Sequence, residues 1–332
     1  MTGPTLGRRG LAVSRLGLGL AAVGRPGYIN LGRSRDLPER TPDALFARAA
    51  GLLDAARASG VRYVDAARSY GRAEEFLSRW LADRMPAPGA LTIGSKWGYR
   101  YTAGWRVDAP VHEEKDLSLA RFRVQLAETR ALLGDHLDLY QIHSATAESG
   151  CLDDAALLRG LVEGRHAGAY RAVGLTLSGP TSARALELAL AAHVDGEPVF
   201  DVVQATFNCL EPSLAAPLAA AREAGMGVIA KEVFANGRLS PANTRPEDAG
   251  LVRALTSEAA RLGCTVDQLA LAFVLSRPFV DVALSGAATI AQLDSHLAAE
   301  DARLDARAEV ALVALAESPT HYWRTRATLP WS

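Results

Sequence analysis

The amino-acid sequence predicts an α/β protein built as a closed (β/α)8 TIM barrel, with an N-terminal β-hairpin and an extra C-terminal helix or tail. Three observations predict this fold. Short apolar segments recur eight times along the 332 residues, and segments of helical periodicity separate them. The apolar segments are rich in Val, Ile and Leu with little alternation, as expected of strands buried on both faces. No low-complexity linker divides the chain, so we expect residues 1–332 to form one domain.

The apolar segments give the predicted strands, which lie at residues 15–20, 61–66, 91–97, 137–143, 170–177, 200–206, 226–232 and 280–286. Parallel strands need crossover helices between them, and eight such strands can close a sheet into a barrel. The predicted helices occupy residues 42–60, 72–84, 117–134, 153–166, 180–192, 213–224, 248–261, 265–276 and 289–299. In 72–84, for example, apolar residues fall at i, i+3, i+4, i+7 and i+8 from Ala73, which is the period of an amphipathic helix.

Two segments lie outside this repeat. Residues 5–13, TLGRRGLAV, have the pattern of a short hairpin with a glycine-containing turn, which we expect to cover the bottom of the barrel. Residues 98–116 follow the third predicted strand, and we expect them to form an extended loop. Long loops in compact domains are commonly functional, and this one leaves the end of the barrel where enzymes of this fold carry their sites.

The composition excludes several classes of function. Apolar residues make up 49% of the chain and the formal net charge is −1, so neither nucleic acid nor an anionic membrane is an expected partner. No apolar run reaches the about 18 residues of a membrane span, and no signal-peptide pattern opens the chain. Cys151, Cys209 and Cys264 are far apart and lack metal-binding spacing, which indicates a reduced cytoplasmic protein without a bound metal. The oligomeric state stays open.

Polar residues gather at the predicted C-terminal ends of successive strands, which converge on one opening in a barrel. Asp65 and Tyr70 follow the second strand. Lys96 ends the third strand and His143 ends the fourth. An ammonium near a phenol lowers the pKa of the phenol, a carboxylate supplies a buried lysine with a partner, and a histidine can orient a substrate oxygen. Together they predict a general acid directed at a carbonyl group that receives a hydride.

Each of these residues also has an ordinary structural interpretation. An aspartate after a strand is commonly a helix cap, a tyrosine commonly packs, a strand-end lysine is commonly solvated and a histidine commonly makes a structural hydrogen bond. The occurrence of all four residues on three successive strands favours catalysis over four independent structural roles.

The segments VDAARSYG, GSKWG and DLYQIH, in this order, resemble the aldo-keto reductase superfamily. The resemblance covers nearly the whole chain and extends to LGLG, YRAVGLT, VVQATFN and LSGAATIAQL. It implies that Asp65, Tyr70, Lys96 and His143 form the catalytic tetrad of that superfamily. It also implies a nicotinamide cofactor bound in extended form across the barrel mouth. Residues 17–22 also match the pattern G-x-G-x-x-A of a Rossmann dinucleotide-binding fold. No clear helix follows them, so we do not interpret this pattern as a dinucleotide fingerprint.

The resemblance further implies which residues hold the nicotinamide. Gln204 matches a glutamine that binds the carboxamide. Thr176 and Leu177 stand where relatives have a Ser-Asn pair, and Ser178 is a candidate substitute. Lys231 stands where relatives stack an aromatic ring, and Glu232 follows it. The alternative interpretation of these last two is an ion pair that closes the barrel top.

The adenosine end of the cofactor is expected at the last strand and its helix. Ser285, Gly286 and Gln292 are the candidate contacts there. Ala288 and His296 stand where relatives often have a cation and an asparagine, so Arg238 is the alternative cation for a 2′-phosphate. The resemblance favours NADPH/NADP+ and leaves NADH/NAD+ open.

An aromatic cluster marks the candidate substrate pocket. Trp97, Tyr99 and Trp105 lie in or beside the segment 98–116, in a chain with only 6% aromatic residues. Aromatic rings at a barrel mouth suit a flat or sugar-like carbonyl substrate, and packing of the loop onto the barrel is the alternative. The motifs resemble the bacterial sugar- and pyridoxal-type branches of the superfamily.

The resemblance implies an NAD(P)H-dependent enzyme that reduces an aldehyde or ketone, or oxidises an alcohol or sugar, with Tyr70 as general acid or base. Two alternatives stay open. One is a cofactor-binding regulatory protein of low turnover, as in the potassium-channel β subunits of that superfamily. The other is a biosynthetic enzyme that uses the barrel for redox-neutral chemistry.

Overall fold

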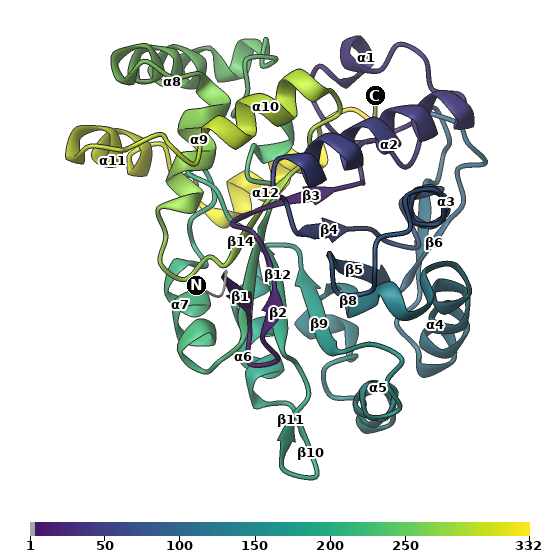
Figure 1. The fold of residues 1–332 in the computed structure, drawn as a ribbon. Coiled ribbons are helices and arrows are strands. Elements are labelled where there is room, and N and C mark those ends of the chain that lie inside the picture. Colours follow the sequence, from purple (N-terminus) through teal and green to yellow (C-terminus); the bar gives the residue numbers. More distant parts are fainter. Residues whose placement is uncertain (1–3) are drawn as a thin grey trace.

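The computed structural model describes residues 4–332 and contains a closed barrel of parallel strands (Figure 1). In barrel order the strands are β3 (Leu16–Gly19), β4 (Tyr63–Asp65), β5 (Thr92–Trp97), β8 (Leu137–Ala145), β9 (Ala172–Leu177), β12 (Val202–Thr206), β13 (Gly227–Lys231) and β14 (Val282–Ser285). β14 pairs with β3 and closes the sheet. One strand lies at each predicted position, so the predicted fold class is confirmed.

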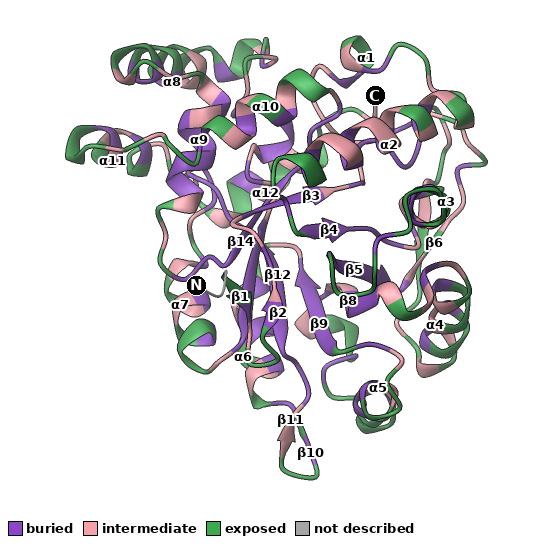
Figure 2. Ribbon diagram, viewed as in Figure 1, coloured by how far each residue is buried: buried purple, intermediate pink, exposed green. Residues whose placement is uncertain are grey.

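Helices follow the strands and surround the barrel. The predicted helices are present as α2 (Pro42–Ala58), α3 (Ala73–Arg84), α4 (Leu119–Leu133), α5 (Ala155–His166), α6 (Ser182–Ala191), α7 (Ala215–Glu223), α8 (Ala249–Leu262), α9 (Val266–Leu275) and α10 (Ile290–Ala298). Their inner faces and the strands are buried, whereas their outer faces are exposed (Figure 2). The short α1 (Arg33–Asp36) and the later helices α11 (Ala306–Val313) and α12 (Pro319–Ala327) complete the set of α-helices in residues 4–332.

The predicted N-terminal hairpin closes the bottom of the barrel. β1 (Thr5–Leu6) pairs antiparallel with β2 (Leu11–Ala12). Leu6 and Leu11 are fully buried in one apolar cluster with side chains from the barrel strands. Gly7 has φ +62°, and a β-carbon there would lie 2.6 Å from the carbonyl oxygen of Asp201, so only glycine fits this turn. The hairpin leaves the opposite end of the barrel for a site.

The segment 98–116 is not the extended loop that the sequence predicted. β6 (Tyr99–Tyr101) pairs antiparallel with β7 (Glu113–Lys115), so the segment folds back on itself as a hairpin. At the end of the loop that joins the two strands, the ring of His112 stacks on that of Trp331, with centroids 3.7 Å apart. Trp331 also pairs through its backbone with Ile29. The hairpin, the loop after β3 and the C-terminal tail therefore meet beside the barrel mouth.

Three smaller features complete the description. β10 (His193–Val194) and β11 (Glu197–Pro198) form a second hairpin that the sequence did not predict. All three cysteines are free thiols. Within residues 4–332, no helix combines the length and the apolar character needed to cross a membrane.

Candidate active site

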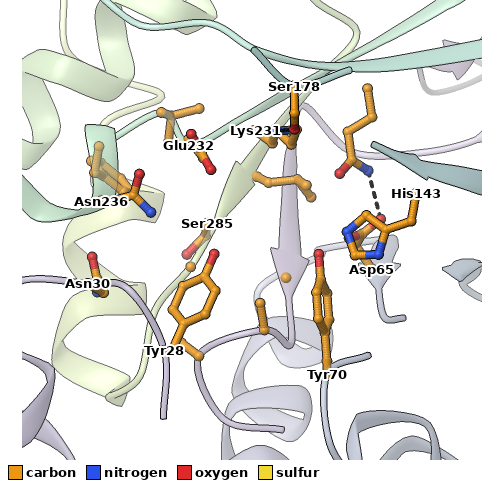
Figure 3. A pocket seen from close by; sticks show the side chains of 18 of the residues that line it. Tyr28, Asn30, Asp65, Tyr70, His143, Ser178, Lys231, Glu232, Asn236 and Ser285 are labelled. Carbon is orange, nitrogen blue, oxygen red and sulfur yellow. Dashed lines mark hydrogen bonds between the residues drawn. The ribbon is translucent and has the colours of Figure 1, made fainter. Parts of the chain in front are cut away.

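The four predicted catalytic residues meet at the C-terminal end of the barrel. Asp65 ends β4, Lys96 lies in β5, His143 lies in β8, and Tyr70 lies on the loop before α3. Lys96 Nζ forms a buried ion pair with Asp65 and donates a hydrogen bond of 2.9 Å to the carbonyl of Ala66. The same Nζ lies 4.6 Å from the centre of the Tyr70 ring. The rings of Tyr70 and His143 meet edge to face, 5.5 Å apart (Figure 3).

The strands place these groups through the geometry of the barrel. Neighbouring side chains of a strand point to opposite faces, so Lys96 points into the barrel and Trp97 points outward. Tyr63 lies beneath Asp65 and donates a hydrogen bond of 3.0 Å to its Oδ2. Gly17 makes room for this tyrosine, because a β-carbon there would lie 2.8 Å from the ring of Tyr63. The carboxylate is thus held from two sides.

Burial governs the ionisation of Tyr70. It raises the pKa of Tyr70 well above the ordinary value, and the negative charge of Asp65 raises that pKa further. The predicted net lowering of the phenol pKa is wrong, because burial and Asp65 outweigh any stabilisation of the phenolate by Lys96. The ammonium lies over the face of the ring, and its charge is matched by Asp65. Tyr70 therefore keeps its proton at neutral pH and is available as a proton donor.

His143 is also uncharged at neutral pH. Burial, and then the positive charge of Lys96, lower the pKa of His143 well below its usual value. Burial lowers the pKa of Lys96 too, although Asp65 opposes this effect. A neutral imidazole offers one N–H donor and one acceptor nitrogen. The site therefore presents a phenol O–H and an imidazole to the same cavity.

The cavity has a volume of about 170 Å³ and is lined by residues of both the tetrad and the predicted cofactor contacts. Gln204 is among the lining residues, and its Nε2 donates a hydrogen bond of 2.9 Å to Asp65. Ser178 also lines the cavity. Thr176 does not, because its hydroxyl accepts a hydrogen bond of 2.8 Å from the backbone N–H of Ser144 beneath the surface. The structure thus places Ser178, and not Thr176, at the cavity.

Lys231 and Glu232 both line the cavity, but they do not form the ion pair of the alternative interpretation. Glu232 pairs with Arg326 of α12, at 2.5 Å. Burial opposes the ionisation of Glu232, yet Arg326 and Lys231 outweigh it and lower the pKa of Glu232 to about 2. Lys231 Nζ instead donates hydrogen bonds to Thr206 Oγ1 at 3.0 Å and to Ser178 Oγ at 3.5 Å.

The predicted adenosine contacts divide between two adjoining cavities. Ser285 and Gly286 line the first cavity. Gln292 lines a second cavity that shares Gly286, Asn30 and Phe234 with the first, and its side chain donates a hydrogen bond to Asp36.

Arg238 lies outside both of these cavities. It is only 4% exposed, and its guanidinium forms ion pairs with Asp248 at 2.8 Å and Glu317 at 2.7 Å. The prediction that Arg238 serves as a cofactor cation is therefore not supported by its position. Four of the five N–H donors of this guanidinium bond the two carboxylates, so its charge is already matched before any phosphate arrives.

Of the three predicted aromatic contacts, only Tyr99 lies at the tetrad. Its ring meets the ring of His143 edge to face at 5.1 Å. Trp97 packs outside the barrel against Phe122 of α4, and Trp105 donates an indole hydrogen bond to the carbonyl of Arg40. Neither of these two residues lines the cavity, and their positions agree with the packing interpretation.

Sequence reasoning missed several residues of the cavity. Arg25 lies 5.1–5.4 Å from the centres of the Tyr28, Tyr70 and Trp331 rings and forms an ion pair with Glu113 at 3.0 Å. Asn30, Asn236 and Arg326 also line the cavity. These residues come from irregular loops and from the C-terminal helix, whose neighbours no local pattern reveals. The run of Arg, Tyr and Asn between β3 and α2 was the one signal present.

A neutral phenol and a neutral imidazole, supported by a buried Lys-Asp pair at the mouth of a (β/α)8 barrel, define a site that can protonate a carbonyl oxygen. A family model described as the Aldo/keto reductase family matches residues 15–315, and the chain belongs to this family. Its members are NAD(P)-dependent oxidoreductases that act on carbonyl groups.

Solved structures show the same fold. The chain is similar to the holo form of the aldo-keto reductase AKR11C1 from Bacillus halodurans, with a TM-score of 0.72 and 21% identity over 96% of this chain and 97% of that chain. It is also similar to PA4992 of Pseudomonas aeruginosa, with a TM-score of 0.63 and 22% identity over 90% and 95% of the two chains. These similarities support the fold, and the resemblance to a sugar- or pyridoxal-type branch stays a prediction.

Proposed function

We propose that this protein reduces an aldehyde or ketone with NAD(P)H and that Tyr70 supplies the proton. The observation that carries this proposal is that Tyr70, His143 and the buried Lys96–Asp65 pair converge at the barrel mouth. All but Lys96 line one cavity. Burial raises the pKa of Tyr70 and lowers that of His143, which suits a proton donor beside a neutral imidazole.

The residues around the cavity suit an extended nicotinamide cofactor. The two adjoining cavities share lining residues, so one elongated molecule can occupy both. The side-chain oxygen of Asn236 is buried at this cavity and has no hydrogen-bond partner within the described residues, which suits an amide N–H of a ligand. Gln204, Ser285 and Gly286 would hold the nicotinamide half, and Gln292 would lie along the adenosine half. When bound, the cofactor supplies a hydride to the carbonyl carbon.

The tetrad completes the reaction at the carbonyl oxygen. His143 and Tyr70 orient that oxygen by hydrogen bonds, and the Tyr70 hydroxyl transfers its proton as negative charge develops there. The ammonium of Lys96, held by Asp65, stabilises the resulting phenolate. In the reverse direction the phenolate accepts the proton of an alcohol.

The proposal includes a cofactor preference and a cellular compartment. NADPH remains the favoured cofactor, as the family resemblance implied. Because Arg238 is engaged in ion pairs, Arg35 is the cation that the second cavity offers to a 2′-phosphate. The reaction would take place in the cytoplasm, where the three free thiols stay reduced.

Tryptophan fluorescence titrations with NADPH and NADH first identify the tighter cofactor, and a screen of aldehydes and ketones with that cofactor then identifies a substrate. The Tyr70→Phe variant, assayed with this pair, tests the proposal. We expect kcat to fall by roughly 100- to 10,000-fold, because the proton donor is lost, while the cofactor Kd is unchanged. The matched control is Tyr101→Phe, because its hydroxyl makes no hydrogen bond within the described residues. Reduction by Tyr70→Phe at the parent rate would overturn the proposal. Tight cofactor binding without turnover would favour the regulatory alternative.

A further inference from the structure

Within residues 4–332, most of the cationic side chains at the cavity are paired with a carboxylate, but one of them is not. Arg25 is paired with Glu113 and Arg326 with Glu232, and below them Lys96 is paired with Asp65. Lys231 has no carboxylate within ion-pair distance among the described residues. Its hydrogen-bond partners are the neutral hydroxyls of Thr206 and Ser178.

The backbone explains why Glu232 does not neutralise its neighbour. Glu232 has φ +53°, an uncommon conformation for a residue with a side chain, at the point where β13 ends. Its carboxylate is turned toward the guanidinium of Arg326, which contacts both carboxylate oxygens, and toward the hydroxyl of Thr206. Lys231 consequently has no carboxylate in contact within the described part of the chain: burial lowers the pKa of Lys231 to about 8, and Glu232 opposes this only through its charge at longer range.

This charge lies close to the catalytic centre. Lys231 is one of the cations that lower the pKa of His143, and both residues line the same cavity. In Figure 3, Lys231 and Ser178 enter the cavity from the side opposite Tyr28 and Tyr70. From Ser178 a contact of 3.3 Å leads to the hydroxyl of Ser144, the residue after His143. An ammonium and two hydroxyls thus extend from β13 toward the tetrad.

We propose that Lys231, assisted by Ser178 and Ser144, binds an anionic group of the substrate. The substrate is then an aldehyde or ketone that carries a carboxylate or a phosphate, and not a neutral sugar. A partly buried charge in a medium of low dielectric is stabilised by a partner of opposite sign, and hydroxyl donors satisfy the other oxygens of such an anion. This inference rests on the proposed function, because the anion must reach Lys231 while the carbonyl lies at Tyr70.

Matched substrates separate charge from shape. The probes are 4-oxobutanoate and its methyl ester, and the variants are Lys231→Met and Lys231→Arg. We expect Lys231→Met to lower kcat/KM for 4-oxobutanoate by roughly 10- to 100-fold and to leave the ester nearly unaffected, because one charged hydrogen bond is lost. Lys231→Arg should restore part of the preference. The control is Arg324→Met, which removes an exposed cation from α12.

Lys231 could instead bind a phosphate of the cofactor. The NADPH Kd of each variant separates this case from binding of an anionic substrate. Equal losses for the acid and the ester, or a weaker NADPH Kd with an unchanged acid-to-ester ratio, would overturn the inference. Binding of butanoate and butanamide, followed by calorimetry, tests the anion site without turnover. If butanoate binds the parent but not Lys231→Met, and the parent shows no reductase activity, the anion site is supported and the proposed function is refuted. Failure of butanoate to bind better than butanamide would refute the anion site alone.

Discussion

At the residue scale, burial decides the chemistry of the site. The sequence predicts which four residues meet, but it also predicted a phenol made acidic by a nearby ammonium. In the structure the pKa of Tyr70 is raised, because burial destabilises the phenolate more than Lys96 stabilises it. The positive charge of Lys96 is already matched by Asp65. The ionisation of a side chain depends on all the groups around it, and only a folded structure supplies them.

His296 leads to a prediction on stability. It is 5% exposed, its Nδ1 lies 2.8 Å from the hydroxyl of Ser285, and its ring stacks on Phe234. Burial lowers the pKa of His296 from 6.5 to about 4. Below pH 6.5 the unfolded chain binds a proton that the folded protein resists, so stability is lost as the pH falls from 6.5 toward 4. We expect thermal melts of His296→Asn to show a weaker decline over this range than the parent.

The control for this experiment is His193→Asn, which changes an exposed histidine and should keep the decline of the parent. If the melting temperatures of His296→Asn and of the parent fall in parallel between pH 6.5 and 4, burial of His296 does not contribute to acid sensitivity.

At the element scale, the regular repeat was predictable and the irregular insertions were not. Strands buried on both faces and amphipathic helices carry their pattern locally, so each predicted strand was found. The β6–β7 hairpin was missed because residues 102–112 separate its two short strands. The contacts of α12 were not predictable either, since Arg326 meets Glu232 across 94 positions of the sequence.

The ion pair between Arg326 and Glu232 fixes α12 against the barrel mouth. The two side chains are 28% and 8% exposed. We expect Arg326→Met to lower the free energy of unfolding by about 1–3 kcal/mol, because it leaves the Glu232 carboxylate without its partner. Urea denaturation measures this change, with Arg324→Met on the same helix as the control. A loss no larger than that of Arg324→Met would mean that other contacts dock α12.

At the scale of the whole molecule, one end of the barrel contributes to stability and the other end carries the candidate active site. The bottom is filled by an apolar cluster that includes Leu6 and Leu11 of the N-terminal hairpin. The opposite end carries the polar cavity and the segments that lie around it. The barrel between them is a packed core, so we expect the two ends to be energetically independent.

Leu6→Ala tests this separation. Leu6 is completely buried, and its replacement should lower the free energy of unfolding by about 2–5 kcal/mol through lost apolar contacts and a cavity. The NADPH Kd should stay at the parent value in fluorescence titrations. Val310→Ala, at a 70% exposed position of α11, is the control for stability. A large change in cofactor affinity without loss of stability would show that the hairpin is coupled to the site.

The sequence by itself determined the eight strands, their order and the residues of the tetrad, because periodicity and strand ends are local properties that a closed barrel repeats. Only the tertiary structure decided the rest. It turned Trp97 outward, joined Arg238 to Asp248 and Glu317, and left Lys231 without a counter-ion. Each of these outcomes depends on which side chains, distant along the chain, share one small volume. Charge compensation and burial are sums over such neighbours, and no single segment contains them.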